Sequence, residues 1–184
     1  MLDIITNTVE MAKIETEQIK INSGKYIIDE IISEIYEDYQ PIAREKSLIF
    51  NLQNNSTDKN QLRAIDREKL EFALKAILNN SFKFTSNGHI DLRYTTDHQY
   101  ISIFIDDTGI GIPRGKQEQI FKPFAQGDEN HNREYGGAGL GLSVARGFIE
   151  AMGGNISIES TEGKGTHVKI SVYAPTISSE TKNN

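Results

Sequence analysis

The sequence predicts a two-layer α/β (α+β) sandwich, in which a mixed, mostly antiparallel sheet is covered on one face by helices. Two observations support this fold class. The candidate strands in the second half of the chain alternate apolar with polar residues, so each has one dry and one wet face. The candidate helices carry apolar residues every three or four positions, which is typical of helices that pack through one side. A doubly wound parallel sheet would need strands that are apolar on both faces, and it does not fit.

The first twenty or so residues predict a helix, in which Leu2, Ile5, Val9 and Ala12 form a narrow apolar seam suited to packing on another helix. Because this pattern is already running at Leu2, we expect the chain to have been cut from a longer one. The alternative is an ordinary N-terminal helix that docks on its own domain. Residues 22–24, Asn-Ser-Gly, break the pattern and mark a boundary.

A second amphipathic helix is predicted from about 26 to 39, and Pro41 is expected to kink it or end it. Residues 48–52 and 63–65 are candidate short strands. A third helix is predicted from 67 to about 83. The inward positions of these two helices are predicted to be Ile28, Ile31, Ile32, Ile35, Leu70, Leu74, Ile77 and Leu78.

The later part of the chain alternates in polarity over residues 90–95, 101–107, 156–159 and 167–172, and these are the predicted strands of the sheet. A last helix is predicted over 142–149, where apolar residues return to helical spacing.

Composition limits the classes of function. At 184 residues, the chain can hold one domain with a well-buried core. The net charge is −6 and no basic stripe is interleaved with aromatic residues, so nucleic acid is not an expected partner. The absence of cysteine excludes disulfide scaffolds, thiolate catalysis and zinc fingers. With no signal peptide and no run long enough to span a bilayer, we expect a cytoplasmic domain without direct membrane insertion, whose parent can still be anchored in the inner membrane.

The run from Ile105 to Pro113 reads as a strand that ends in an acid and opens into a glycine-rich turn. Alternation places Asp107 on the same face as the apolar residues of this strand. Burying a carboxylate costs free energy unless a donor meets it, and the amino group of a ligand is one such donor. Gly109 and Gly111 would let that ligand approach the backbone closely. A β-turn with a solvated aspartate is the alternative.

A second glycine cluster, residues 136–141, leads directly into the predicted helix 142–149. Backbone N–H groups at the positive end of a helix form a ready site for phosphate. The cluster lacks the Gly-Lys-Ser/Thr of a P-loop and the spacing of the dinucleotide fingerprint. A flexible hinge before a helix is the alternative.

A third feature lies on the predicted helix 67–83, where Asn80 and Lys83 share one face at the edge of the apolar stripe. An amide carbonyl oxygen can ligate Mg²⁺, and a nearby ammonium can meet phosphate oxygens. Helix capping by asparagine is the alternative.

Taken in order, these features resemble the ATP-binding catalytic domain (HATPase_c) of bacterial sensor histidine kinases, which is of the Bergerat, GHKL-type, ATPase superfamily. Each motif is weak alone, but their order and spacing over residues 26–173 are specific. The matching motifs are the N box at 80–85, the G1 box at 107–112, the F box at 121–124, the G2 box at 137–142 and the closing glycine motif at 163–166.

The resemblance implies a protein histidine kinase with ATP and Mg²⁺ as cofactors. Asp107 would accept a hydrogen bond from the adenine amino group, and Asn80 would hold Mg²⁺. Lys83 and the backbone around Gly139 to Gly141 would meet the phosphates. The full set implied to bind ATP is Asn80, Lys83, Phe84, Asp107, Gly109, Gly111, Ile112, Phe121, Phe124, Arg133, Gly137, Gly139, Leu140, Gly141, Leu142 and Thr166.

By the same resemblance, residues 125–135 would form the mobile ATP lid, docked by Phe121 and Phe124. The polar, glycine-bearing composition of this segment independently indicates a flexible loop. Arg133 matches the basic residue that often precedes the G2 box, and a solvated loop charge is the alternative reading.

The resemblance also divides the chain and implies partners. Residues 1–22 would be a remnant of the dimerisation helix, the second of a hairpin, residues 23–174 the catalytic domain, and residues 175–184 a disordered tail or linker. The implied partners are the dimerisation and phosphoacceptor domain of the same protein, the receiver domain of a response regulator, and a second copy in a full-length homodimer. The acceptor histidine is expected outside this chain, because none of the four histidines has the family's acidic neighbour: His89, His98, His131 and His167.

One position departs from the family. Ala76 stands one helical turn before Asn80, where relatives usually carry asparagine and hydrolysing relatives a catalytic glutamate. Slow intrinsic ATP hydrolysis follows, since no side-chain base is present there. The alternatives to a histidine kinase are a catalytically impaired nucleotide-binding regulatory module, which Ala76 motivates, and a serine-kinase anti-sigma factor of the same superfamily. The N-terminal seam and the Phe-x-Pro-Phe motif argue against the latter.

Overall fold

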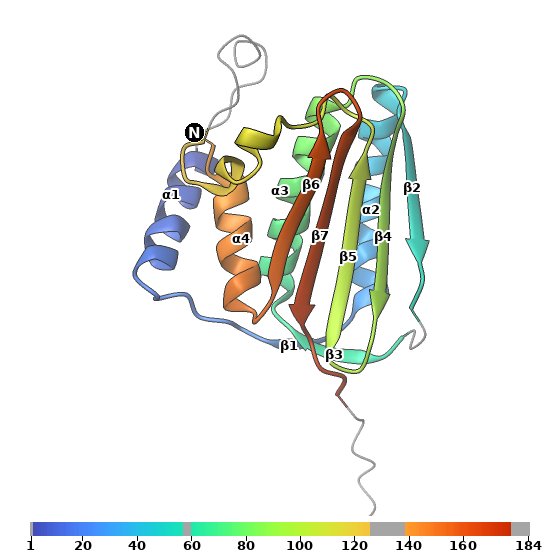
Figure 1. Ribbon diagram of the computed structural model, residues 1–184. Helices are drawn as coiled ribbons and strands as arrows, with labels where there is room; N and C mark the ends of the chain where they lie inside the picture. The colour runs from blue at the N-terminus through green and yellow to red at the C-terminus, as the bar shows by residue number, and fades with distance from the viewer. Residues whose placement is uncertain (1, 57–59, 126–138, 178–184) are drawn as a thin grey trace, which may run out of the picture.

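A computed structural model describes residues 2–56, 60–125 and 139–177, which form one layer of sheet and one layer of helices (Figure 1). The strands of the main sheet are β2 (Ile49–Asn54), β4 (His89–Thr96), β5 (Tyr100–Asp107), β6 (Asn155–Thr161) and β7 (Gly165–Tyr173). They are arranged in the order β2–β4–β5–β7–β6. The β2–β4 pair is parallel and the remaining pairs are antiparallel. The mixed, mostly antiparallel sheet predicted from the sequence is therefore confirmed.

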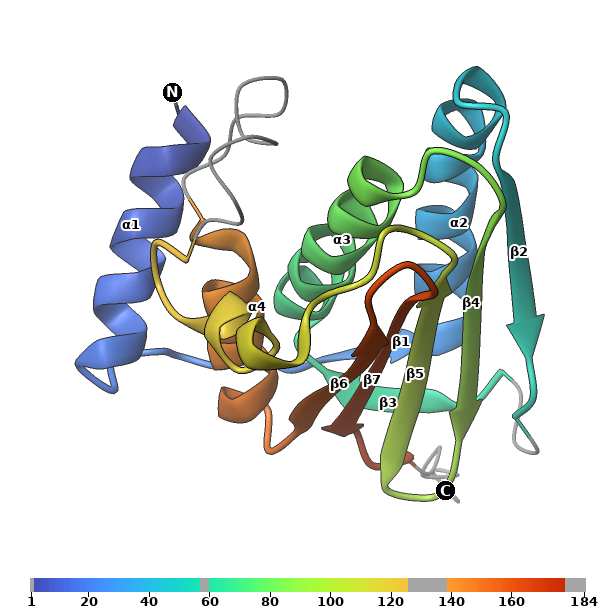
Figure 2. The same cartoon turned by 45° about the horizontal axis from the view of Figure 1, so that its top comes forward.

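The helices gather on one side of this sheet, as predicted. They are α1 (Leu2–Glu15), α2 (Ile28–Glu45), α3 (Arg67–Phe84) and α4 (Gly141–Ala151), with 3-10 turns η1 (Arg114–Lys116) and η2 (Gln119–Phe121). In Figures 1 and 2, α2 and α3 lie behind the sheet, α4 lies next to them, and α1 packs on the outer side of α4. None of the helices in the described part of the chain is both long and apolar enough to cross a membrane.

The core lies between the sheet and the helices. Ile101, Ile103 and Ile105 of β5 are fully buried, and the residues between them are only partly covered. This alternation is what the sequence predicts for a sheet with one covered face. Every predicted inward position of α2 and α3 is buried: Ile28, Ile31, Ile32, Ile35, Leu70, Leu74, Ile77 and Leu78.

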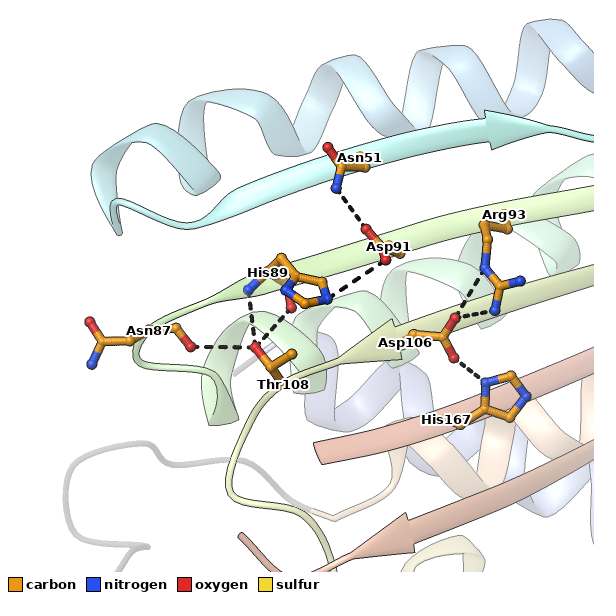
Figure 3. A network of polar contacts seen from close by, with 8 residues as sticks. All are labelled: Asn51, Asn87, His89, Asp91, Arg93, Asp106, Thr108 and His167. Atoms are coloured by element: carbon orange, nitrogen blue, oxygen red, sulfur yellow. Dashed lines mark hydrogen bonds and ion pairs between the residues drawn. The ribbon is translucent and has the colours of Figure 1, made fainter. Parts of the chain in front are cut away.

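The opposite face of the sheet carries a network of polar side chains (Figure 3). Asp106 of β5 contacts both Arg93 of β4 and His167 of β7. Asn51 of β2 donates to Asp91 at 2.7 Å. The charges on this face are thus largely met by one another, and such exposed pairs add little to stability.

A second, small sheet lies across the end of the molecule. Its strands are β1 (Gly24–Ile27) and β3 (Leu62–Ile65), which pair antiparallel. Pro175 and Ile177 hydrogen-bond to the other edge of β3, where the Ala64 N–H donates to Pro175 at 3.1 Å and the Ile177 N–H donates to Leu62 at 2.8 Å. The first residues of the segment predicted as a tail or linker are therefore paired, and residues 178–184 lie outside the described residues.

Arg63 is buried at this end of the molecule and connects its segments through hydrogen bonds. Its side chain is 1% exposed, and its guanidinium donates to the Ala174 carbonyl at 2.8 Å and to the Asp97 carbonyl. Buried charges are rare unless they are hydrogen-bonded in this way. The interaction joins β3, the β4–β5 turn and the end of β7.

Three local predictions differ from the structure. Residues 24–27 form β1, so α2 begins at Ile28 rather than near Tyr26. α2 continues through Pro41 to Glu45, so the expectation that Pro41 ends the helix is wrong. A proline removes one helical hydrogen bond, but α2 continues past it and buries Ala43. α1 ends at Glu15, earlier than the twenty or so residues expected.

One side of α1 packs on α4, and another side is exposed. Ile14 packs against α4, because a Cβ placed on Gly147 would lie 2.5 Å from Ile14 Cδ1. The seam faces away, with Ile5 63% exposed and Val9 48% exposed. α1 therefore packs on α4 of the same chain and leaves Ile5 and Val9 of its seam exposed. The origin of this helix in a longer dimerisation helix stays a prediction.

Candidate functional site

Asp107 ends β5 on the side of the helices. Its Oδ2 accepts a hydrogen bond from Ser81 Oγ of α3 at 3.0 Å, and its Oδ1 accepts one from the Gly109 N–H at 3.0 Å. The backbone N–H of Thr166, its register partner on β7, also donates to the carboxylate. The inward orientation that alternation predicts for this acid is the one found.

Burial raises the pKa of the Asp107 carboxyl above its ordinary range. The donors at Gly109, Ser81 and Thr166 oppose this rise, while the neighbouring charge of Asp106 adds to it. The ionised form is therefore held in the folded chain against a desolvation cost. A carboxylate perturbed by burial and enclosed by donors is a candidate for ligand binding.

Gly109 brings the loop after β5 against the end of α3. A Cβ on this residue would lie 2.5 Å from the Phe84 carbonyl oxygen, 2.9 Å from Thr85 Oγ1 and 3.0 Å from Asp107 Oδ1. The Ile110 N–H also donates to the Phe84 carbonyl at 3.1 Å. The glycine was predicted for close approach of a ligand, but the approach that the structure shows is between two parts of the chain.

Gly111 has a similar role on the other side of the loop. Its φ is 68°, which disfavours other residues, and a Cβ would collide with the Thr161 carbonyl in the β6–β7 turn. The Ile112 N–H donates to Ser160 Oγ at 2.8 Å, and the Ser160 and Thr166 hydroxyls lie 3.0 Å apart. Ile112 and Thr166 thus help to position the loop that follows Asp107.

Thr85 is a buried hydroxyl beside this loop. It is 1% exposed, and its Oγ1 has no hydrogen-bond partner within the described ranges. Buried polar atoms are nearly always paired, so this hydroxyl, which lies beside Gly109 as the Asp107 carboxylate does, is a candidate contact for a ligand.

Asn80 and Lys83 lie on α3, three residues apart and half-buried. Burial lowers the pKa of the Lys83 ammonium, and its Nζ lies 5.0 Å from the centroid of the Phe84 ring. Asn79 is already engaged, because its Oδ1 accepts from Tyr39 Oη at 2.7 Å. No cluster of three or more His, Cys, Asp or Glu side chains that could hold a metal occurs in the described residues. A single amide oxygen still fits Mg²⁺, which keeps several waters and takes other ligands from phosphates.

Ala125 and Gly139, the described residues on either side of 126–138, lie against each other. A Cβ on Gly139, whose φ is 68°, would lie 2.7 Å from the Ala125 carbonyl oxygen. Phe121 is buried, with Arg146 Cζ 5.7 Å from the centroid of its ring, whereas Phe124 is 67% exposed. Of the predicted lid, 125–135, all but Ala125 lies outside the described residues, Arg133 included, as does Gly137, so its docking by Phe121 and Phe124 stays a prediction.

α4 begins at Gly141 without a side-chain cap and without an acidic residue in its first turn. Its positive end is therefore free of a carboxylate from its own first turn, which suits an anion. Leu140 before it is buried, and Leu142 packs on the core. A Cβ on Gly141 would lie 3.9 Å from the Ala76 Cβ. α3 therefore contacts the start of α4 at Ala76 and the β5 loop at its own end.

A cavity of about 430 Å³ lies nearby, between the loop at 112–117 and the strand end at 159–162. Asp107, Asn80 and Lys83 are not among the residues that line it. The contacts around Asp107, rather than this open depression, define the candidate site.

Ser81 and Thr85 were not singled out from the sequence. Ser81 had a usable signal, because a serine occupies the apolar stripe of α3 seven residues after Leu74 and four after Ile77. A polar side chain on a buried stripe needs a partner, and here the partner is Asp107. Thr85 follows the helix and had no comparable signal.

Comparisons with known proteins match most of this chain to one family. The model of the family described as "Histidine kinase-, DNA gyrase B-, and HSP90-like ATPase" matches residues 65–176. The autoinducer 2 sensor kinase/phosphatase LuxQ of Vibrio vulnificus is 32% identical over 94% of this chain, and the sensor histidine kinase RcsC of Escherichia coli is 33% identical over 94%. The chain spans only 21% and 18% of the lengths of these two relatives.

The fold is also found among solved structures. Full-length ShkA, solved in complex with AMPPNP, superposes with a TM-score of 0.84 over 97% of this chain and 36% of that one, at 23% identity. The family match over 65–176 covers more than half of the chain and includes α3, Asp107 and the start of α4. It belongs to the family of histidine kinase-, DNA gyrase B- and HSP90-like ATPases.

Proposed function

We propose that this chain is the ATP-binding catalytic part of a two-component sensor histidine kinase. It binds Mg·ATP and passes the γ-phosphoryl group to a histidine outside this chain. The observation that carries the proposal is the carboxylate of Asp107, which faces the helix layer and is enclosed by donors from α3, the following loop and β7. The relatives over 94% of the chain are sensor kinases, which supports the same reading.

Adenine recognition rests on Asp107. Its ionised carboxylate has acceptor positions beyond those used by Ser81 and Gly109, and an exocyclic amino group is a matching donor. A hydrogen bond to a charged, partly buried acceptor is among the stronger ones available to a ligand.

The phosphates would lie toward α4 and the polar face of α3. The backbone N–H groups at Gly139 to Gly141 and the Lys83 ammonium are the donors, and the Asn80 carbonyl oxygen is the metal ligand. Mg²⁺, when bound, neutralises phosphate charge. Positioning and charge neutralisation are the main demands of phosphoryl transfer, and these residues can meet them.

The acceptor histidine and the partners lie beyond this chain. The exposed seam of α1, with Ile5 and Val9, suits the dimerisation and phosphoacceptor domain of the same protein and a homodimer of the parent. A response regulator receiver domain would then take the phosphoryl group. The fragment alone would bind nucleotide without labelling itself. The impaired module and the anti-sigma factor are not favoured, since the relatives named above are sensor kinases.

Calorimetry with Mg·ATP tests the adenine assignment. Asp107→Asn should weaken binding by roughly 10- to 100-fold, because one charge-assisted hydrogen bond is lost. Asp106→Asn is the matched control, since Asp106 is the next residue on the same strand but contacts Arg93 and His167 on the open face (Figure 3). Equal affinity of wild type and Asp107→Asn would refute the proposal.

A second experiment tests the transfer. The chain is supplied with the dimerisation and phosphoacceptor domain of its parent and with γ-labelled ATP. Label on a histidine is expected, whereas label on a serine of a partner would favour the anti-sigma reading.

A further inference from the structure

Ser81 links the helix layer to the acid at the end of β5. It is 3% exposed, and its Oγ lies 3.0 Å from Asp107 Oδ2. An ionised carboxylate can only accept hydrogen bonds, so the serine is the donor whenever Asp107 is charged. The other donors, at Gly109 and Thr166, are backbone N–H groups. Among these three donors, Ser81 is the one that donates through its side chain, so it is the donor that a substitution can remove.

We propose that Ser81 determines the base specificity of the site: by donating to Asp107 it keeps that carboxylate a pure acceptor, so the site selects 6-amino purine nucleotides over 6-oxo purine nucleotides. The inference rests on the proposed function, because it takes Asp107 to meet the base. It assigns Ser81 a positioning role, since Ser81 acts through Asp107.

The selection follows from the hydrogen-bonding edges of the two kinds of base. Adenine presents an amino donor at C6, whereas hypoxanthine and guanine present a carbonyl acceptor there. An ionised carboxylate and that carbonyl are both hydrogen-bond acceptors. Their oxygen lone pairs would face each other without a hydrogen between them, which is unfavourable. A protonated carboxyl has an O–H donor and can pair with it. Discrimination between the bases therefore depends on the charge of Asp107.

The surroundings of Asp107 make this charge sensitive to Ser81. Burial and the charge of Asp106 favour the protonated form, and the donors oppose them. The register partners on β4 and β7, Ile90 and Thr166, carry no charge. On α3, Lys83 lies two residues after Ser81, and burial lowers its pKa. Removing the serine hydroxyl shifts this balance toward the protonated carboxyl.

The test measures the affinities of ADP and of inosine diphosphate, which carries the 6-oxo group, without Mg²⁺, from roughly pH 4, near the ordinary aspartate pKa, up to roughly pH 8. Wild type should prefer ADP, and its preference should shrink as the pH falls. At the acidic end of this pH range, Ser81→Ala should reduce the preference for ADP over inosine diphosphate roughly tenfold, as expected for the loss of one hydrogen bond to a charged group. Ser81→Thr keeps the hydroxyl and should restore the ratio.

Ser102→Ala is the matched control, because Ser102 lies on the same strand as Asp107 and is only partly buried on the opposite face. It should leave the ratio unchanged. Equal weakening of both nucleotides by Ser81→Ala would mean that Ser81 only packs, which overturns the inference. A wild-type ratio that does not change with pH overturns it without any variant. A wild type that binds neither nucleotide overturns the proposed function itself.

Discussion

Asp66 accepts a hydrogen bond from the backbone N–H of Asn22 at 2.8 Å while it caps α3 by accepting from the Lys69 N–H at 3.2 Å. The Lys69 ammonium also donates to Asp66 Oδ2 at 2.8 Å. Asn22 lies in the segment between α1 and β1, whereas α3 carries Asn80 and Lys83. One carboxylate, 3% exposed, therefore joins the chain that arrives from the N-terminal helix to the helix that bears the candidate site.

Asp66→Ala should destabilise the domain by about 2–4 kcal/mol. The variant loses a helix N-cap, which is typically worth about 1 kcal/mol, and it leaves a backbone N–H and an ammonium without their partner. Urea denaturation measures the loss. Asp38→Ala is the control, because Asp38 is 62% exposed and its ion pair with Lys75 should contribute at most about 1 kcal/mol. Similar midpoints for both variants would contradict the anchoring role of Asp66.

The stabilisation by Asp66 should depend on pH in a definite direction. Burial acts to raise the pKa of Asp66, but hydrogen bonds from the Lys69 side chain and from the N–H groups of Asn22 and Lys69 outweigh it and lower the pKa. A lowered pKa in the folded state means that the contribution is complete above the ordinary aspartate pKa and disappears as the pH falls through the folded value. The stability gap between wild type and Asp66→Asn should therefore close below roughly pH 4. A gap that widens on acidification would contradict this assignment.

Gly111→Ala should destabilise the domain by at least about 1–2 kcal/mol, because the residue has a φ of 68° and an added methyl would meet the Thr161 carbonyl. Gly115→Ala is a close control in the same loop, since a Cβ there has nothing within 4 Å and no strained φ. Its effect should fall between neutral and about 1 kcal/mol of stabilisation. Thermal unfolding of both variants measures the difference, and equal melting temperatures would argue against the described loop.

Asp107→Asn should raise the melting temperature of the nucleotide-free domain even though it weakens adenine binding. Asparagine can accept from the Gly109 N–H and donate to Ser81 Oγ, and it carries no charge to desolvate. For a domain of this size, each kcal/mol gained raises the melting temperature by about 2–4 °C. The gain should shrink on acidification, since the raised pKa of Asp107 lets the wild type take up a proton in the folded state before it would when unfolded. A lower melting temperature for the variant at neutral pH would refute this account.

The features that could be predicted from the sequence are those in which apolar residues recur at a regular spacing. Two-residue alternation in β5 placed Asp107 on the covered face, and the apolar stripe of α3 fixed which side of that helix is buried. β1 was not predicted, because Tyr26 and Ile27 run directly into the helical pattern of α2 and because its pairing with β3 joins Gly24 to Ile65, far apart in the sequence. The internal role of Gly109 was also missed. A glycine in the sequence indicates that there is little room for a side chain, but it does not indicate which neighbouring group occupies that room.

Thr85→Val should leave the stability of the nucleotide-free domain unchanged or raise it slightly. The Thr85 hydroxyl is buried and without a hydrogen bond to any described residue, and a methyl group of the same shape removes the cost of keeping it dry. If the hydroxyl serves a ligand, the same variant should bind ADP less tightly, by up to roughly tenfold. Calorimetry with ADP, paired with thermal unfolding, separates the two effects. A large loss of stability without nucleotide would mean that Thr85 has a structural partner after all.

Ala76→Asn should strengthen the Mg²⁺-dependent part of ATP affinity. Ala76 lies one turn before Asn80, on the same face of α3, and 3.9 Å from the Cβ position of Gly141, so a longer side chain here is close to the start of α4. An amide at this place can orient the ligand or its waters, and such supporting contacts are worth roughly 10- to 100-fold in metal affinity. ATP affinity measured with Mg²⁺ and with a chelator gives the difference. Leucine has a volume similar to that of asparagine but no oxygen. Ala76→Leu should therefore weaken the ATP affinity or leave it unchanged, both with Mg²⁺ and with the chelator. If both variants respond alike, the alanine at this position acts through packing, and the magnesium site is complete without the family's second asparagine.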